Sequence, residues 1–305
     1  MEWKHVRGNT WALEGPQLVG VYQLDESRCV LLDPGSSRMR QGVEDALEER
    51  GLTPAWILCT HMHYDHHENS RYFREKYGAK ICLPQLEADI VRCEQSLKNH
   101  LYNFTMGLVR TDRRLRNLVC PVDRVLSFGE EGMELDGVPF GALRTPGHSP
   151  DHCCFITPDD VCFAGDTLMT DDVLETAMVP FVFDMTDDLA SKVLLGETRH
   201  AAYLLCHAGV IYGSVEGLAA RNIARIRARI AACRDLVTGP MTYSRFYAAA
   251  VTAFALPVGH PIRAQHLERY IRPYLEYLID SGAAELIDLD GAPAVRPKRR
   301  PPSIS

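Results

Sequence analysis

The sequence lacks long apolar runs, paired cysteine motifs and an excess of positive charge. No stretch approaches the roughly 18 apolar residues that a membrane-spanning helix needs, so we expect no membrane partner. The first residues, from Met1 to His5, contain no apolar core of signal-peptide length. The ten cysteines form no Cys-x-x-Cys pair, and several, such as Cys59, lie in apolar runs where buried free thiols are common. We therefore expect a protein of the reducing cytoplasm.

The shortage of positive charge also bears on the class of partner. A net charge of −7 at pH 7 argues against nucleic acid as an obligatory partner. A chain of 305 residues, 46% of them hydrophobic, is long enough for one large globular domain with an appendage.

Short apolar runs separated by turn residues predict that the chain begins with strands. Residues 18–24 and 29–32 predict a hairpin, and helical spacing over residues 43–50, with Gly51 as the stop, predicts a helix. Residues 55–59 then predict a buried strand. Further strands are expected at residues 124–126, 133–135, 140–143, 153–156, 161–164 and 203–206.

Two other regions have helical patterns. Residues 86–118 predict a helical insertion, which serves either as a covering layer or as a lid over a site. From residue 214 onward, helices are expected around residues 218–230, 242–254 and 267–278, followed by a hairpin over residues 285–295. We divide the chain into a main domain, 1–213, and a mostly helical, winged-helix-like region, 214–305. The second region is expected to pack on the main domain or to form a homodimer contact rather than to read nucleic acid.

The segment from His61 to His67 is the densest group of metal-binding residue types in the chain. His61, His63 and Asp65 alternate, and on an extended backbone such residues point the same way. We therefore expect an extended segment that turns into a helix at Asp65 and His66. His61 and His63 would then serve one ion, and Asp65 and His66 a second ion nearby.

Two ions need more ligands, and the chain offers them at later strand ends. His148, Asp166 and His207 each lie in a glycine-containing loop, where the backbone and a metal can approach closely. Together with Asp65, the Asp166 carboxylate and a bridging hydroxide would leave two divalent ions with a small positive charge. Such a charge suits an anionic transition state.

The pattern His-x-His-x-Asp-His, then Thr-Pro-Gly-His, Gly-Asp and a final His, strongly resembles the metallo-β-lactamase-fold hydrolase superfamily, including its glyoxalase II and thioesterase-like branches. The resemblance runs from about residue 10 to residue 213. The segment Leu31-Leu32-Asp33-Pro34-Gly35 also looks like an early element of that family. The resemblance implies an α/β fold, a four-layer αββα sandwich with the site along one edge of its two sheets.

The resemblance also implies a ligand set. Residues His61, His63 and His148 would hold metal 1. Residues Asp65, His66 and His207 would hold metal 2, and Asp166 would bridge the two. His67 is expected in the surroundings of the site or on the surface. The implied ions are two Zn²⁺, with Fe or Mn as alternatives. Histidine at position 63 favours zinc, because diiron relatives carry an acid there.

These ligands imply a hydrolase that uses a metal-bridging hydroxide on an ester-like bond of a small molecule, a thioester or a lactone. Asp65 would orient the hydroxide and carry a proton. The Gly-Cys-Gly-Arg segment of glyoxalase II is replaced by residues 169–172, and the tyrosine of quorum-quenching lactonases is absent. Residues 63–66 and 182–184 look similar to quinolone-signal thioesterases. The residues Phe181, Phe183, Tyr102 and Phe104 are candidates for an apolar acyl pocket, and His100 for packing or surface.

Three alternatives stay open. A mononuclear iron sulfur dioxygenase, acting on a persulfide, would reuse His61, His148 and Asp166. A phosphodiesterase or nuclease would need a basic arm that the acidic main domain lacks. A regulator with a vestigial site would not need all seven ligands.

Overall fold

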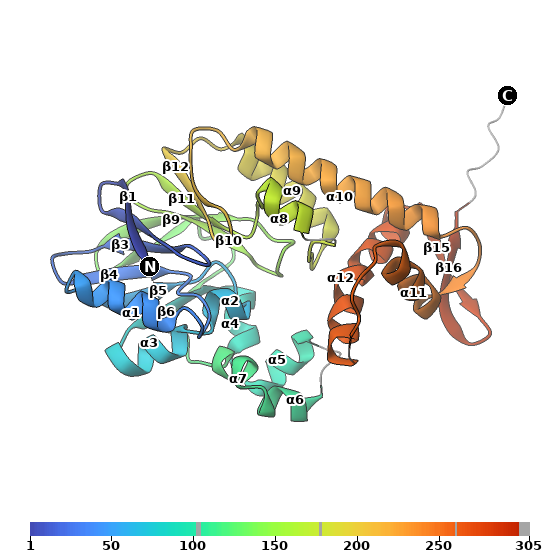
Figure 1. Cartoon of the computed structure of the whole chain (residues 1–305), viewed down its shortest axis with the longest axis horizontal. Coiled ribbons are helices and arrows are strands. Elements are labelled where there is room, and N and C mark those ends of the chain that lie inside the picture. Colours follow the sequence, from blue (N-terminus) through green and yellow to red (C-terminus); the bar gives the residue numbers. More distant parts are fainter. Residues whose placement is uncertain (102–104, 177–178, 260, 299–305) are drawn as a thin grey trace.

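The computed structural model describes residues 1–101, 105–176, 179–259 and 261–298, and it contains two mixed sheets packed face to face. Helices cover the outer face of each sheet, and a mostly helical region follows at the C-terminal end (Figure 1). The expected four-layer αββα sandwich is therefore confirmed. None of the helices in the described part of the chain has the length and apolar character needed to cross a bilayer.

The first sheet has seven strands in chain order. Its first four strands pair antiparallel, which confirms the predicted hairpin as β3 and β4. From β4 to β7 the strands pair parallel, so their carboxyl ends meet at one edge, where ligand sites are commonly built. The strands are β1 (Glu2–Arg7), β2 (Thr10–Glu14), β3 (Val19–Gln23), β4 (Arg28–Leu32), β5 (Thr53–Leu58), β6 (Lys80–Pro84) and β7 (Arg124–Leu126).

The second sheet has six strands in the order β13-β12-β11-β10-β9-β8. Only β11 and β12 pair parallel within it; the other neighbours are antiparallel. The strands are β8 (Gly132–Leu135), β9 (Val138–Arg144), β10 (Cys153–Ile156), β11 (Val161–Gly165), β12 (Ala202–Leu205) and β13 (Gly209–Tyr212).

Each central strand is buried on both faces, which explains its continuous apolar sequence. In β4, Val30 and Leu32 belong to the core between the sheets, while Cys29 and Leu31 belong to the core beneath the outer helices. Helices α1 (Arg40–Glu49) and α3 (Ser70–Tyr77) cover the first sheet. Helices α9 (Met185–Glu197) and α10 (Glu216–Leu236) cover the second sheet, near the short α8 (Asp171–Thr176).

Four short helices occupy the stretch in which the sequence predicts an insertion. They are α4 (Gln85–Val91), α5 (Glu94–Leu101), α6 (Met106–Thr111) and α7 (Arg113–Leu118). Their apolar residues Leu97, Leu101 and Val109 are buried in the core of the first sheet, so these helices pack on it, while a lid function stays a prediction. Its α5 also reaches the neighbourhood of the metal-rich segment, as described below.

The C-terminal region contains the expected order of three helices and a hairpin. These elements are α10, β14 (Met241–Thr242), α11 (Tyr243–Ala253), α12 (Pro261–Asp280), β15 (Ala284–Leu289) and β16 (Ala292–Pro297). Helix α10 starts on the second sheet, where Leu218 is buried, and ends in a separate apolar core around Ile226 and Cys233. In Figure 1, α12 begins beside α5 and α6 and runs back into this core. The domain boundary at residue 213, the winged-helix label and a homodimer contact stay predictions.

Candidate metal centre

The chain leaves β5 at Leu58 and reaches a single turn of helix, α2 (Tyr64–His67), after five residues, 59–63, that belong to no helix or strand. His63, which precedes that turn, has φ −59° and ψ 148°, an extended backbone. This is the path that the alternation of His61, His63 and Asp65 predicts. It leads to two different groups of side chains, one with His61 and His63 and one with Asp65 and His66.

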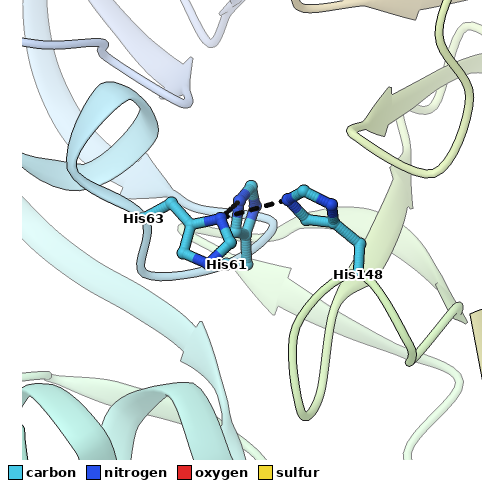
Figure 2. A group of neighbouring side chains, drawn as sticks. All are labelled: His61, His63 and His148. Carbon is cyan, nitrogen blue, oxygen red and sulfur yellow. Dashed lines mark hydrogen bonds between the residues drawn. The ribbon is translucent and has the colours of Figure 1, made fainter. Parts of the chain in front are cut away.

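Three imidazoles of the first group converge on one point (Figure 2). His61 Nε2 lies 2.9 Å from His63 Nδ1, and His148 Nε2 lies 3.1 Å from the same atom. Figure 2 shows His148 approaching from a loop opposite the other two. A tetrahedral zinc ion with bonds of about 2.0–2.1 Å keeps its nitrogen ligands roughly 3.3 Å apart. The spacing of these nitrogens therefore fits a metal ion.

The second group consists of Asp65, His66 and His207. His207 Nε2 lies 3.4 Å from Asp65 Oδ2, and His66 Nε2 lies 3.7 Å from the same oxygen. Asp166 contacts both groups, because its Oδ2 is 3.3 Å from His66 Nε2 and 3.4 Å from His148 Nε2, while its Oδ1 is 3.4 Å from His207 Nε2. Asp166 therefore occupies the position that a bridging ligand requires.

Two buried atoms of this cluster lack a hydrogen-bond partner among the described residues: His66 Nε2 and Asp166 Oδ1. Buried polar groups without partners are rare in native proteins, and a cation next to both atoms would satisfy them. Five imidazoles and two carboxylates form a donor set that zinc binds, and iron and manganese are compatible with it. We call the seven residues the ligand cluster; that they bind two ions stays a prediction.

The protonation states of the cluster suit a cation. Burial and the neighbouring imidazoles lower the pKa of His61 and of His63 well below the ordinary value, so both rings are neutral, as metal binding requires. Burial also lowers the pKa of His207, but the contacts with the Asp166 and Asp65 carboxylates outweigh this effect and raise it to about 9. A bound cation would take the place of that proton.

Asp33 orients ligands of both groups. Its carboxylate accepts hydrogen bonds from Thr60 N and Thr60 Oγ1, each at 2.7 Å, and lies 2.8 Å from His66 Nδ1. Thr60 Oγ1 in turn lies 2.9 Å from His61 Nδ1. Such contacts fix the ring orientation and tautomer of metal-binding histidines. Asp33 lies in a segment that resembles an early element of the family, but the sequence predicts no role for it.

Glu87, at the start of α4, joins the two loops that carry the first group, and sequence reasoning missed it. Its Oε2 accepts a hydrogen bond from Met62 N at 3.1 Å, between two of the ligands. Its Oε1 accepts hydrogen bonds from Ser149 Oγ at 2.7 Å and Asp151 N at 2.9 Å, next to His148. Burial raises the pKa of Glu87 to about 7. A lone glutamate in an apolar helical pattern carries no sequence signal for this contact.

His152 was also missed. It is buried, its Nδ1 lies 2.8 Å from Thr145 Oγ1, and its Nε2 accepts a hydrogen bond from Asp166 N at 3.2 Å. It thus positions the backbone of Asp166 rather than joining a ligand group. Its place four residues after His148 was the available signal.

The glycines beside the ligands are required for a different reason than the sequence suggested. Gly147 has φ +120°, and a methyl group there would overlap the backbone of Asp188 at the start of α9. Gly165 has φ +50°, and a methyl group would lie 2.7 Å from Thr60 Oγ1. Neither conformation suits other residues. Close packing of neighbouring elements, rather than approach of a metal, requires glycine at these two positions.

Two histidines lie outside the ligand groups, as predicted; His67 is buried and His100 is partly buried. His67 is fully buried between two thiols, with Nδ1 3.4 Å from Cys59 Sγ and Nε2 3.3 Å from Cys120 Sγ. His100 stacks on Phe183, with ring centroids 5.8 Å apart. All ten cysteines are free thiols, which confirms the sequence expectation for Cys59.

Phe181 forms a wall of the ligand cluster. Its ring centroid lies 5.3 Å from that of His63 and 5.8 Å from that of His148. The ring of Tyr270 on α12 contacts its other side at 5.1 Å, so the C-terminal region reaches the centre. Of the four aromatic residues expected to line a pocket, Phe181 and Phe183 lie near the cluster, and Tyr102 and Phe104 lie outside the described residues.

Curated relatives match parts of the chain. A probable metallo-hydrolase, YqgX of Bacillus subtilis, is 28% identical over 167 residues, which cover 54% of this chain and 73% of the relative. The hydroxyacylglutathione hydrolase GloC of Haemophilus influenzae is 32% identical over 47% of this chain and 63% of its own length. An atrochrysone carboxyl ACP thioesterase of Passalora fulva is 29% identical over 42% of this chain, a match that spans only 30% of that relative.

Solved structures share the fold along nearly the whole chain. A metallo-beta-lactamase family protein from Thermus thermophilus superposes with a TM-score of 0.73 at 24% identity, covering 95% of this chain and 98% of the other. A beta-lactamase domain protein from Burkholderia ambifaria gives a TM-score of 0.72 at 16% identity, covering 97% and 94%. The sequence model of the metallo-beta-lactamase superfamily matches residues 12–207, which include every residue of the ligand cluster. The chain therefore belongs to the metallo-beta-lactamase superfamily.

Proposed function

We propose that this chain is a zinc-dependent hydrolase that cleaves an ester-like bond, a thioester or a lactone, in a small molecule. The observation that carries the proposal is the position of Asp166, whose two oxygens face nitrogen ligands of both groups. A carboxylate shared in this way supports a centre of two ions. His61, His63 and His148 would hold one ion, and Asp65, His66 and His207 the other.

Two bound zinc ions would supply hydroxide at neutral pH, because zinc lowers the pKa of water from 15.7 to about 7, and would polarise the substrate carbonyl. The neutral rings of the first group and the buried Asp166 carboxylate would favour binding of these cations. Asp65 is partly exposed, with 29% of its side chain accessible; its Oδ2 faces the ligand nitrogens, and its other oxygen would take up a proton and return it. It is our candidate catalytic residue.

The reaction needs no further reagent. Water adds across the carbon–sulfur or carbon–oxygen bond of the substrate, which yields a carboxylic acid and a thiol or, from a lactone, a hydroxy acid. A thiol with a pKa near 8.5 leaves without strong help from an acid. The absence of a separate acid in the ligand cluster therefore favours a thioester over a lactone.

The names of two relatives point the same way, since one is an ACP thioesterase and another a hydroxyacylglutathione hydrolase. Each match covers less than half of this chain, so these names support a reaction class and not a substrate. The quinolone-signal enzymes that residues 63–66 resemble are also thioesterases. Thioester hydrolysis is thus our first choice and lactone hydrolysis our second.

Metal analysis of the purified protein, joined to a panel of an ester, a thioester, a lactone and a phosphodiester, tests the proposal. We expect two zinc ions per chain and turnover of the thioester or the lactone. One iron per chain with oxygen consumption on a persulfide would instead identify a sulfur dioxygenase. Turnover of the phosphodiester alone would identify a phosphodiesterase, and no turnover of any substrate would point to a regulator.

A further inference from the structure

A pocket of about 340 Å³ lies beside the ligand cluster, between residues 181–183 and α12. We call it the side pocket. It is of the size that holds a small ligand. Phe181 belongs both to this pocket and to the wall against His63 and His148, so the pocket begins one aromatic ring away from the predicted metal ligands.

Arginine dominates the polar lining of the side pocket. Arg269 and Arg272 project from α12, and Glu276 is the one acidic residue among the described lining residues. Arg272 forms an ion pair at 2.8 Å with Glu268, one turn away on the same helix. The guanidinium carbon of Arg269 lies 5.2 Å from the centroid of the Phe181 ring, which forms a wall of the ligand cluster.

His100 completes the polar end of this arrangement. Its Nε2 lies 3.5 Å from a terminal nitrogen of Arg269, and its ring stacks on Phe183. Burial, with a smaller contribution from the Arg269 charge, lowers the pKa of His100 to about 3, so the ring is neutral and able to donate or accept a hydrogen bond. Three separate segments, α5, residues 181–183 and α12, thus meet around one guanidinium.

We propose that the side pocket binds a carboxylate of the substrate, with Arg269 as the anion-binding residue and Phe181 as the spacer between that carboxylate and the bond that is cleaved. The proposal rests on the proposed hydrolase function and adds a substrate class, an anionic acyl compound. A guanidinium presents its N–H groups in a planar fork that matches a carboxylate, and the flat Phe181 ring fixes the plane from which the substrate approaches.

A comparison of substrates tests this class. The probes are the phenyl thioester of glutaric acid, the same thioester with its free carboxylate methylated, and the butyryl thioester of 3-mercaptopropionate. The first carries the anion on the acyl side and the last on the thiol side. We expect kcat/KM to be about 10- to 100-fold higher for the glutaryl thioester than for its methyl ester. Equal values for all three probes would overturn the proposal, and preference for the mercaptopropionate probe would assign the pocket to the leaving thiol.

Variants connect this preference to the residue. Arg269→Gln should abolish the ratio between the charged and methylated substrates, and Arg269→Lys should retain part of it because lysine keeps the charge without the fork. Arg234→Gln is the matched control, since Arg234 lies on the exposed surface of α10 in an ion pair with Asp235 and should leave the ratio unchanged. A ratio that survives in Arg269→Gln would exclude Arg269 as the anion-binding residue.

Calorimetry separates this proposal from the function on which it rests. Glutarate and its dimethyl ester, which carries no free carboxylate, are titrated into zinc-loaded wild-type protein and Arg269→Gln, with no turnover required. Glutarate binding that is at least tenfold tighter than ester binding, and that depends on Arg269, would support the carboxylate site even if no thioester were cleaved. Equal binding of both compounds, in a protein that hydrolyses neutral thioesters, would overturn the carboxylate site and leave the hydrolase function intact.

Discussion

The ligand cluster and the side pocket lie next to each other but are held in place in different ways. The cluster sits on strand-end loops whose backbone N–H groups donate buried hydrogen bonds to Asp33, Glu87 and His152. The side pocket lies between α12 and residues 181–183, and ring contacts of Tyr270 with Phe181 and of His100 on α5 with Phe183 hold these segments together. The comparison indicates that more buried hydrogen bonds hold the predicted metal ligands than hold the wall proposed to select the substrate.

Removal of one ligand should have the largest effect. His63→Ala deletes a nitrogen from the first group, and we expect loss of at least one metal ion and a fall in kcat/KM on the order of 10³-fold. Inductively coupled plasma mass spectrometry gives the metal content, and circular dichroism checks that the fold is retained. Wild-type activity in His63→Ala would show that the first group does not hold the catalytic ion.

The next largest effect should come from the loop that carries His148. Gly147→Ala introduces a methyl group into the backbone of Asp188 at a φ of +120°, and we expect the free energy of unfolding to fall by about 3 kcal/mol or more. Urea denaturation measures the change. Gly213→Ala is the matched control, because Gly213 has φ +84° with no atom within 4 Å of the added methyl and should cost only about 1 kcal/mol. Equal losses in both variants would mean that α9 does not constrain the loop.

The pH dependence of the free energy of unfolding tests the hydrogen bonds by which Glu87 joins the two loops. The Glu87 pKa of about 7 in the folded protein exceeds the ordinary value of 4.5, so the folded state keeps the proton over this interval while the unfolded state releases it. The contribution of Glu87 to the free energy of unfolding should therefore fall by up to about 3 kcal/mol as the pH rises from 4.5 to 7, and stay constant above.

Glu87→Gln should remove this part of the pH dependence, because an amide does not ionise. It should also cost about 1–3 kcal/mol at every pH, because an amide N–H would face the Met62 N–H. Urea denaturation of the metal-free wild type and variant between pH 4.5 and pH 8 gives the difference. Parallel curves for the two proteins would show that Glu87 titrates normally.

The smallest effect is expected in the wall of the side pocket. Phe183 is 42% exposed, so Phe183→Ala should keep the metal content, change the free energy of unfolding by less than about 1 kcal/mol and lower kcat/KM less than about tenfold. Phe163→Ala is the contrasting control, since that ring is fully buried between the sheets and its loss should cost about 3–5 kcal/mol. Loss of metal in Phe183→Ala would mean that the wall of the side pocket also helps to position the metal ligands.

The sequence predicts the cluster better than its surroundings, for a physical reason. Ligands such as His61 and His63 lie two positions apart in the chain, and their side chains point the same way only on an extended backbone. Glu87 is different, because it acts through contacts with residues 25 and more than 60 positions away. Nothing in its local sequence distinguishes a buried glutamate that joins two loops from an exposed glutamate.

The same reason accounts for what was predicted of the fold. Continuous apolar runs predict strands such as β4 and β5, because both faces of these strands are buried. Helix α9 was missed because its sequence has a weak apolar face, although Asp184 caps it by accepting a hydrogen bond from Asp187 N at 2.9 Å. The sequence names Phe181 and Phe183 as candidate pocket residues, but the arginines beside them could not be foreseen, since they depend on where α12 lies relative to residues 181–183.

The ligands come from both sheets, and this has a consequence for how the protein unfolds. His61, His63, Asp65 and His66 follow a strand of the first sheet, whereas His148, Asp166 and His207 follow strands of the second. Any ion held between them would act as a cross-link across the open edge of the sandwich, in the way that a disulfide joins two layers. Because an ion that binds only the folded chain adds its binding free energy to stability, chelation should lower the melting temperature and part the sheets first at this edge.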